Sequence, residues 1–212
     1  MEKKTYQTEQ EQFWAGEFGT EYIDRNKSDA YLASNIHFFA QALKQTFQLS
    51  SVIEFGANIG MNLKAIRMLY PKVKLEGIEI NEDATRILAE IIGPDSVQNC
   101  SIFDIDSTQK YSLTLIKGVL IHINPEMLNL VYQKLYDCSE KYILVAEYYN
   151  PTPVSIKYRG HDNRLFKRDF AGEMMQQFKD LQLIDYGFVY KNDPSFPQDD
   201  ITWFLMQKND TI

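Results

Sequence analysis

Apolar and polar residues follow two different periods along this chain, and the change between the periods marks a series of strands and helices. Apolar residues recur at helical spacing in four segments, which begin or end at Ser28 or Asp29, Pro71, Gly93-Pro94 and Asn124-Pro125. Short apolar runs between these segments predict strands at about 52–55, 73–80, 97–103, 111–117 and 142–146. Alternating strands and helices predict parallel strand pairing and an α/β fold.

The last third of the chain changes character. Residues 151–168 are predicted to form a long loop. A helix capped by Asp169 comes next, and two strands follow it at about 184–191 and 201–207, with a turn-rich loop but no helix between them. Such a pair is antiparallel. We therefore expect a doubly wound seven-stranded sheet, mostly parallel, with an antiparallel C-terminal hairpin strand.

The N-terminal segment is polar at first and then aromatic. Residues up to about 10 are predicted to form a frayed tail. The aromatic residues and glycines that follow, among them Trp14, Phe18 and Tyr22, are too dense for a solvated arm and should cover something. We expect residues 1–45 to form a helical cap that packs on a single structural domain completed by residues 46–212.

Composition and charge narrow the function. The formal net charge of -7 disfavours nucleic acid as a partner, and no apolar run approaches the length of a membrane span. The N-terminus lacks the apolar core of a signal peptide, so we expect a cytoplasmic location. Cys100 and Cys138 have no C-x-x-C partner, and we interpret them as small apolar residues in a buried strand and at a helix end. The three histidines lack metal-ligand spacing, so no metal is expected.

The stretch 52–60 is the strongest local signal. Its E-x-G-x-N-x-G pattern places Gly56 and Gly60 between a strand and a helix, where backbone amides could approach a nucleotide. Glu79 ends the next strand 23 positions after Gly56, which is typical of an acid that accepts from a ribose hydroxyl. The alternatives are an ordinary strand-to-helix turn and a solvated acid at a strand end.

Basic residues gather in an otherwise acidic chain between positions 157 and 168. They are Lys157, Arg159, Arg164, Lys167 and Arg168, together with His161. We interpret Arg159, His161 and Arg164 as binding an anionic acceptor such as a carboxylate or a phosphate. Solvated loop charges are the alternative.

The alternating units, the glycine turn, the acid after the second strand and the terminal antiparallel pair together resemble the S-adenosylmethionine-dependent methyltransferases of Rossmann-like fold. Residues 117–123 look like their fourth-strand segment. A closer resemblance, to the methylase family associated with pseudaminic acid biosynthesis, rests on residues 13–26, 55–60 and 117–125 and covers nearly the whole chain. It implies a bacterial enzyme linked to nonulosonic sugar pathways, with S-adenosylmethionine as cofactor and a small molecule or sugar as methyl acceptor.

The resemblance also assigns cofactor contacts to residues of this chain: Glu54, Gly56, Asn58, Gly60, Glu79, Ile80, Ser101, Ile102, Asp104, Lys117 and Gly118. Ser101 stands where many relatives have an acid beside the adenine, so adenine recognition could fall to Ile102 or Asp104. Among the aromatic residues of the cap, Tyr22 could shield the sulfonium, while Arg25 could pair with the cofactor carboxylate. A hydrophobic lid with a surface arginine is the alternative.

Methyl transfer from a sulfonium needs an aligned acceptor, exclusion of water and a group that removes a proton. Candidates at the carboxyl ends of the fourth and fifth strands are His122, Glu147, Tyr148 and Tyr149, of which His122 is the first choice because its unperturbed pKa suits the task. His122 could instead only pack. Two other functions stay open: a NAD-dependent oxidoreductase, and a non-catalytic S-adenosylmethionine-binding regulator of glycan biosynthesis.

Overall fold

The computed structural model describes residues 6–23, 27–158 and 161–209, excepting the side chains of residues 161–163. Within this part of the chain, one seven-stranded sheet has the order β3-β2-β1-β4-β5-β9-β8. Its strands are β1 (Ser51–Phe55), β2 (Lys74–Ile78), β3 (Val97–Gln98), β4 (Tyr111–Lys117), β5 (Ser139–Glu147), β8 (Leu181–Val189) and β9 (Ile201–Lys208). The pairs from β3 to β5 are parallel, whereas β9 is antiparallel to both β5 and β8. The predicted fold class is confirmed.

Helices cover both faces of this sheet, as its alternating sequence predicts. They are α3 (Asp29–Ala42), α4 (Met61–Leu69), α5 (Glu82–Ile92), α6 (Leu128–Cys138) and α7 (Phe170–Gln177). Residues of α3, α4 and α5 share one buried apolar cluster with the sheet, and residues of α6 and α7 share the other. A parallel sheet buried on both faces accounts for the nearly continuous apolar runs of β1 and β4.

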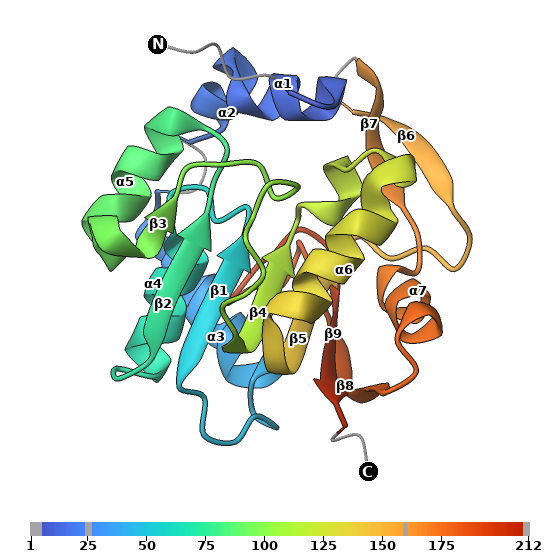
Figure 1. Ribbon diagram of the computed structural model, residues 1–212. Coiled ribbons are helices and arrows are strands. Elements are labelled where there is room, and N and C mark those ends of the chain that lie inside the picture. Colours follow the sequence, from blue (N-terminus) through green and yellow to red (C-terminus); the bar gives the residue numbers. More distant parts are fainter. Residues whose placement is uncertain (1–5, 24–26, 159–160, 210–212) are drawn as a thin grey trace.

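The N-terminal helices lie across the carboxyl ends of the parallel strands (Figure 1). They are α1 (Glu9–Ala15) and α2 (Glu17–Tyr22). The predicted frayed tail is wrong from Thr8 onward, because Thr8 and Glu11 form a capping box: the Thr8 hydroxyl accepts from Glu11 N, and the Glu11 carboxylate accepts from Thr8 N. The T-x-x-E spacing of these two residues was the sequence signal for this helix start. Ser28 caps α3, as predicted.

The predicted long loop at residues 151–168 is a hairpin instead. Strands β6 (Val154–Tyr158) and β7 (His161–Lys167) pair antiparallel in a sheet of their own, and Figure 1 shows them projecting beside α1, away from the main sheet. From Val154 to Lys157 every residue of β6 is exposed, so the strand lacks the buried face that gives a sheet strand its alternating pattern. The hairpin could not be recognised by its burial pattern.

The third strand is also shorter than its apolar run suggests. Pairing between β2 and β3 covers only two residues, after which the Asn99 amide donates to the carbonyls of Glu79 and Ile80 at 2.9 and 3.2 Å. This side chain ties the chain to the end of β2 and turns it out of the sheet. Cys100 is therefore half-buried in a loop and not in a buried strand, whereas Cys138 ends α6 and is fully buried.

Candidate functional site

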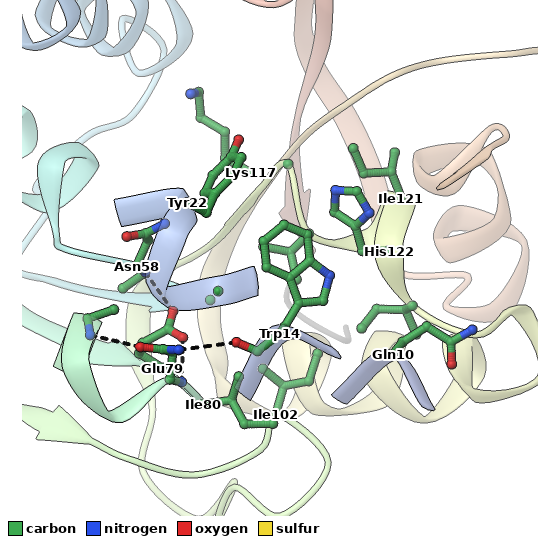
Figure 2. A pocket seen from close by; sticks show the side chains of 18 of the residues that line it. Gln10, Trp14, Tyr22, Asn58, Glu79, Ile80, Ile102, Lys117, Ile121 and His122 are labelled. Atoms are coloured by element: carbon green, nitrogen blue, oxygen red, sulfur yellow. Dashed lines mark hydrogen bonds between the residues drawn. The ribbon is translucent and has the colours of Figure 1, made fainter. Parts of the chain in front are cut away.

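A cavity lies at the carboxyl ends of β1, β2 and β4, where the sheet order runs outward in two directions from β1 and β4. This is the place where open α/β sheets bind ligands. The turn after β1, the end of β2, the loop after β3 and the segment after β4 line it, and α1 and α2 close one side (Figure 2). The cavity brings together most residues that the sequence assigns to a cofactor.

The glycine turn forms one wall of the cavity. Gly56 has φ +75°, and its N–H and that of Ala57 both donate to Ile78 O at 2.9 Å. A Cβ on Gly56 would lie 2.6 Å from Val119 Cγ2, so glycine allows the turn to pack against the segment after β4. Gly60 also has positive φ, but a Cβ there would meet Leu88 Cδ1 at 2.6 Å. Packing against α5 requires this second glycine, which is not among the described residues that line the cavity.

Glu79 is buried at the end of β2 and faces the cavity (Figure 2). Its two carboxylate oxygens accept from Asn58 N at 2.7 Å and from Asn81 N at 2.8 Å. Burial raises the pKa of Glu79, while these backbone N–H groups lower it. Asn58 itself has φ +48° and presents its amide beside this acid. The acid and the glycine turn are thus one hydrogen-bonded unit.

Asn81 connects this unit to the N-terminal helices. Its Oδ1 caps α5 by accepting from Asp83 N and Ala84 N at 3.1 and 3.0 Å. Its Nδ2 lies 3.4, 3.3 and 3.2 Å from Trp14 O, Gly16 O and Thr20 Oγ1. Asn81 is not among the site residues predicted from the sequence, although an asparagine before Glu82-Asp83 is a typical helix start.

The adenine side predicted from the sequence lies at the loop after β3. Ser101, Ile102 and Phe103 line the cavity there, together with Ile80. Asp104 is exposed and accepts from Gln7 Nε2 at 3.2 Å, and it is not among the described residues that line the cavity. An apolar slot with backbone groups is therefore what this side offers to a planar base.

Lys117 and Gly118 line the opposite side, where the sequence places the methionine end of a cofactor. The Lys117 ammonium lies 5.7 and 5.5 Å from the ring centres of Tyr31 and Phe38. Asn62 lines the cavity beside them and donates to Glu54 Oε1 at 2.6 Å. Asn62 Oδ1 and Glu54 Oε2 are buried with no hydrogen-bond partner among the described residues, and burial raises the pKa of Glu54 to about 8.

Aromatic rings close the cavity. The Trp14 ring centre lies 5.3 Å from those of Phe18 and Tyr22 and 4.7 Å from that of His122, whose ring is 5.1 Å from that of Tyr158. Arg25, which the sequence assigns to the cofactor carboxylate, lies outside the described residues, as does Arg159.

His122 is held in one orientation. Its Nδ1 lies 2.6 Å from the Arg164 carbonyl oxygen, which can only accept, so Nδ1 carries the hydrogen and Nε2 keeps its lone pair. Burial lowers the pKa of His122 to about 4, so the ring is neutral at neutral pH. Figure 2 shows the ring beside Trp14 and Ile121 in the cavity. This side chain can accept a proton there, but its lowered pKa makes it a weaker base than the unperturbed pKa on which the sequence prediction rests.

The other predicted catalytic residues differ in position. Tyr148 lines the cavity, and burial raises its pKa. Glu147 is buried behind the segment after β4, where its Oε1 accepts from Val119 N and Leu120 N at 2.9 and 2.8 Å. Tyr149 is 42% exposed and packs on Phe204. Neither Glu147 nor Tyr149 is among the described residues that line the cavity.

Three of the basic side chains already have partners in the protein. Arg164 forms an ion pair with Glu9 at 3.1 Å, which joins the hairpin to α1, and Arg168 pairs with Glu173 at 2.6 Å. The Lys167 ammonium lies 5.0 Å from the ring centre of Tyr148. Lys157 is exposed, and the side chain of His161 lies outside the description.

Two further findings concern the described residues alone. No group of three or more histidine, cysteine, aspartate or glutamate side chains within them is placed to hold a metal ion. None of their helices is long and apolar enough to cross a membrane.

Several solved methyltransferases have a similar fold. No protein-family model matches the chain, and no curated protein matches it. The Burkholderia thailandensis 1,6-didemethyltoxoflavin-N1-methyltransferase, with 1,6-didemethyltoxoflavin and S-adenosylhomocysteine bound, has a TM-score of 0.70 at 13% identity over 91% of this chain and 86% of that one. The plantazolicin methyltransferase, in complex with a pentazolic desmethylPZN analogue and S-adenosylhomocysteine, has a TM-score of 0.64 at 14% identity over 94% of this chain and 95% of that one.

A third structure, the magnesium protoporphyrin IX methyltransferase of Synechocystis with S-adenosylmethionine bound, has a TM-score of 0.65 at 9% identity over 97% of this chain and 100% of that one. The chain therefore has the Rossmann-like fold of class I S-adenosylmethionine-dependent methyltransferases. The narrower resemblance to methylases associated with pseudaminic acid biosynthesis stays a prediction.

The contacts of Asn81 generate a stability prediction. Asn81→Ser keeps a capping oxygen for α5 but cannot reach the N-terminal helices, whereas Asn81→Ala loses both. We expect chymotrypsin to cleave after Phe13 or Trp14 faster in both variants than in the wild type. Urea denaturation should show that Asn81→Ala is less stable than Asn81→Ser by about 1 kcal/mol, the value of a capping hydrogen bond. Wild-type cleavage rates in both variants would contradict the link between Asn81 and the N-terminal helices.

Proposed function

We propose that this protein is an S-adenosylmethionine-dependent methyltransferase that transfers a methyl group to an oxygen or nitrogen of a small molecule. The observation that carries the proposal is the meeting of the Gly56 turn, Glu79 and Lys117 in one cavity between the diverging halves of the sheet. The fold of the solved methyltransferases supports it.

The residues of the cavity fit this cofactor from end to end. Glu79 has acceptor lone pairs for a ribose diol, and the Ile102 side offers an apolar slot for adenine. At the other end Lys117 suits the methionine carboxylate. The unpartnered oxygen of Asn62, which lines the cavity, suits the methionine ammonium, because a buried oxygen without a donor is costly until a ligand supplies one. Glu54 is not among the described residues that line the cavity, but it accepts from Asn62 and has a second unpartnered oxygen there.

The cofactor, when bound, supplies a methyl group on a sulfonium, and the chain's own residues do the rest. Trp14 and its neighbouring rings exclude water from the cavity and present aromatic faces that favour a cation. His122 receives the proton of the acceptor at Nε2, the nitrogen left open by its contact with Arg164. Tyr148 is the second polar group that can orient an acceptor from the end of β5.

For the acceptor we propose a small molecule or a sugar, and the resemblance to methylases of nonulosonic sugar pathways suggests an anionic one. Within the described part of the hairpin, we propose Arg164 for this role, although it is not among the described residues that line the cavity, because its carbonyl contacts His122 and its guanidinium pairs with Glu9, whose side chain is 81% exposed. An acceptor carboxylate could replace that of Glu9. Incubating labelled cofactor with extracts of cells that make or lack nonulosonic acids would test this proposal and identify the acceptor.

The two other functions make different demands. A NAD-dependent oxidoreductase would use the same glycine turn, but the antiparallel β8–β9 pair argues against it. A non-catalytic regulator would bind S-adenosylmethionine without turnover. A His122 with an open nitrogen inside the cavity is a reason to prefer an enzyme.

Glu79 gives the direct test of cofactor binding. Glu79→Gln loses the charge, and its amide nitrogen cannot accept from one of the two backbone N–H groups that Glu79 holds. Calorimetry should therefore show S-adenosylhomocysteine bound at least about tenfold more weakly, the difference between a charge-assisted and a neutral hydrogen bond. Glu82→Gln, at an exposed acid on the first turn of α5, is the control and should bind as the wild type does. Unchanged affinity in Glu79→Gln, or tighter binding of NAD than of S-adenosylhomocysteine, would refute the proposal.

Glu54 gives a pH prediction. Because its pKa is raised to about 8, Glu54 is protonated in the free protein at neutral pH and must ionise to pair with an ammonium. Binding should then release a proton, and the affinity for S-adenosylhomocysteine should rise up to about tenfold per pH unit from pH 6 towards 8. Calorimetry in buffers of different ionisation enthalpy measures this release. Glu54→Gln should abolish it, and proton uptake by the wild type would exclude the role.

A further inference from the structure

Glu147 is the buried acid that the proposed chemistry does not use. The residue is 2% exposed, it is not among the described residues that line the cavity, and burial raises its pKa to about 7. An acid enclosed at this depth is costly unless its contacts repay the lost hydration. The hydrogen bonds that Glu147 accepts therefore indicate its role.

Those contacts hold the short turn that carries His122. Glu147 Oε1 accepts from both Val119 N and Leu120 N, the first amides of the 3₁₀ turn Leu120–His122. These amides lack a partner within the turn, as at any helix start, so the carboxylate caps them. His122 N then donates to Val119 O at 2.8 Å. The backbone of His122 is thus fixed through two residues by an acid on the neighbouring strand.

The same turn also packs against the Gly56 turn and is hydrogen-bonded to β5. The side chain of Val119 fills the space that a Cβ on Gly56 would need, and Gly118, with φ +69°, donates its N–H to Ala146 O at 2.9 Å. The turn ends at His122, whose Nδ1 makes the 2.6 Å contact with the Arg164 carbonyl.

We propose that Glu147 is a positioning residue for His122. It holds the Val119 and Leu120 amides so that His122 Nδ1 meets the Arg164 carbonyl and Nε2 faces the cavity with its lone pair. A direct catalytic part for Glu147, which its place at the end of β5 suggests from sequence, is not needed. The consequence for methyl transfer rests on the proposed function, whereas the hold on the ring does not.

Two substitutions of Glu147 separate the effect of the length of its side chain from the effect of its charge. Glu147→Gln keeps an acceptor oxygen at the same distance, whereas Glu147→Asp keeps the charge but is one methylene too short to reach both amides. Long-range ¹H–¹⁵N NMR correlation of the imidazole rings reports which nitrogen carries the hydrogen. The chain has three histidines, so His122→Asn assigns the signal. We expect the wild type and Glu147→Gln to show the Nδ1–H form of His122, and Glu147→Asp to lose it as the major form.

A matched control is Glu76→Asp, at an acid on β2 that accepts from Tyr111 and Gln98. It should weaken its own contacts and leave the His122 signal unchanged. Retention of the Nδ1–H form in Glu147→Asp, its loss in Glu147→Gln, or an equal change in Glu76→Asp would overturn the proposal.

Calorimetry with S-adenosylhomocysteine on the same samples distinguishes this proposal from the proposed function. Absence of binding by the wild type would count against the methyltransferase, while the ring signals alone decide the role of Glu147.

Discussion

The backbone N–H groups of the turns after β1 and β4 need hydrogen-bond acceptors, and the geometry of the rest of the site depends on which groups accept from them. Glu79, just after β2, accepts from the turn after β1, and Glu147, at the end of β5, accepts from the turn after β4. Glu79 follows β2, which lies outside β1 in the sheet, and Glu147 ends β5, which lies outside β4. The two acids therefore hold the turns on the two sides of the cavity. Because an unpaired buried amide costs about 1–3 kcal/mol, these contacts fix both turns.

A second layer of contacts sets the N-terminal helices over this frame. Asn81 reaches three oxygens of the N-terminal segment while it caps α5, and Arg164 reaches Glu9 of α1 from the hairpin. The aromatic rings that close the cavity are therefore carried by an element anchored at both ends of the site. The backbone N–H of Asn81 donates to the Glu79 carboxylate, while the Asn81 side chain contacts the N-terminal helices. The cavity wall at Glu79 and the helices that cover the cavity are therefore connected through Asn81.

Much of this arrangement could be predicted from sequence, because burial on both faces of a parallel sheet leaves apolar runs of the right length. Gly56, Glu79 and Lys117 stand at strand ends, where topology alone brings them together. The contacts of Asn81 with the N-terminal helices and those of Glu147 with the turn after β4 could not be predicted, because hydrogen bonds between side chains and distant backbone leave no periodic trace. The β6–β7 hairpin escaped because it has no buried face, and β3 was overestimated because Asn99 ends it by a tertiary contact.

The hairpin touches the ring of His122 through a main-chain oxygen. Any residue at position 164 presents a carbonyl, so this hydrogen bond does not depend on which side chain stands there, whereas the Tyr158 ring of β6 also lies 5.1 Å from the His122 ring. From Val154 to Lys157, β6 is exposed and contributes nothing to the cores beneath the main sheet. The exposed part of β6 is thus free to diverge in sequence while the walls of the cavity and the orientation of His122 stay as they are. New acceptor preferences could evolve there at little risk to folding.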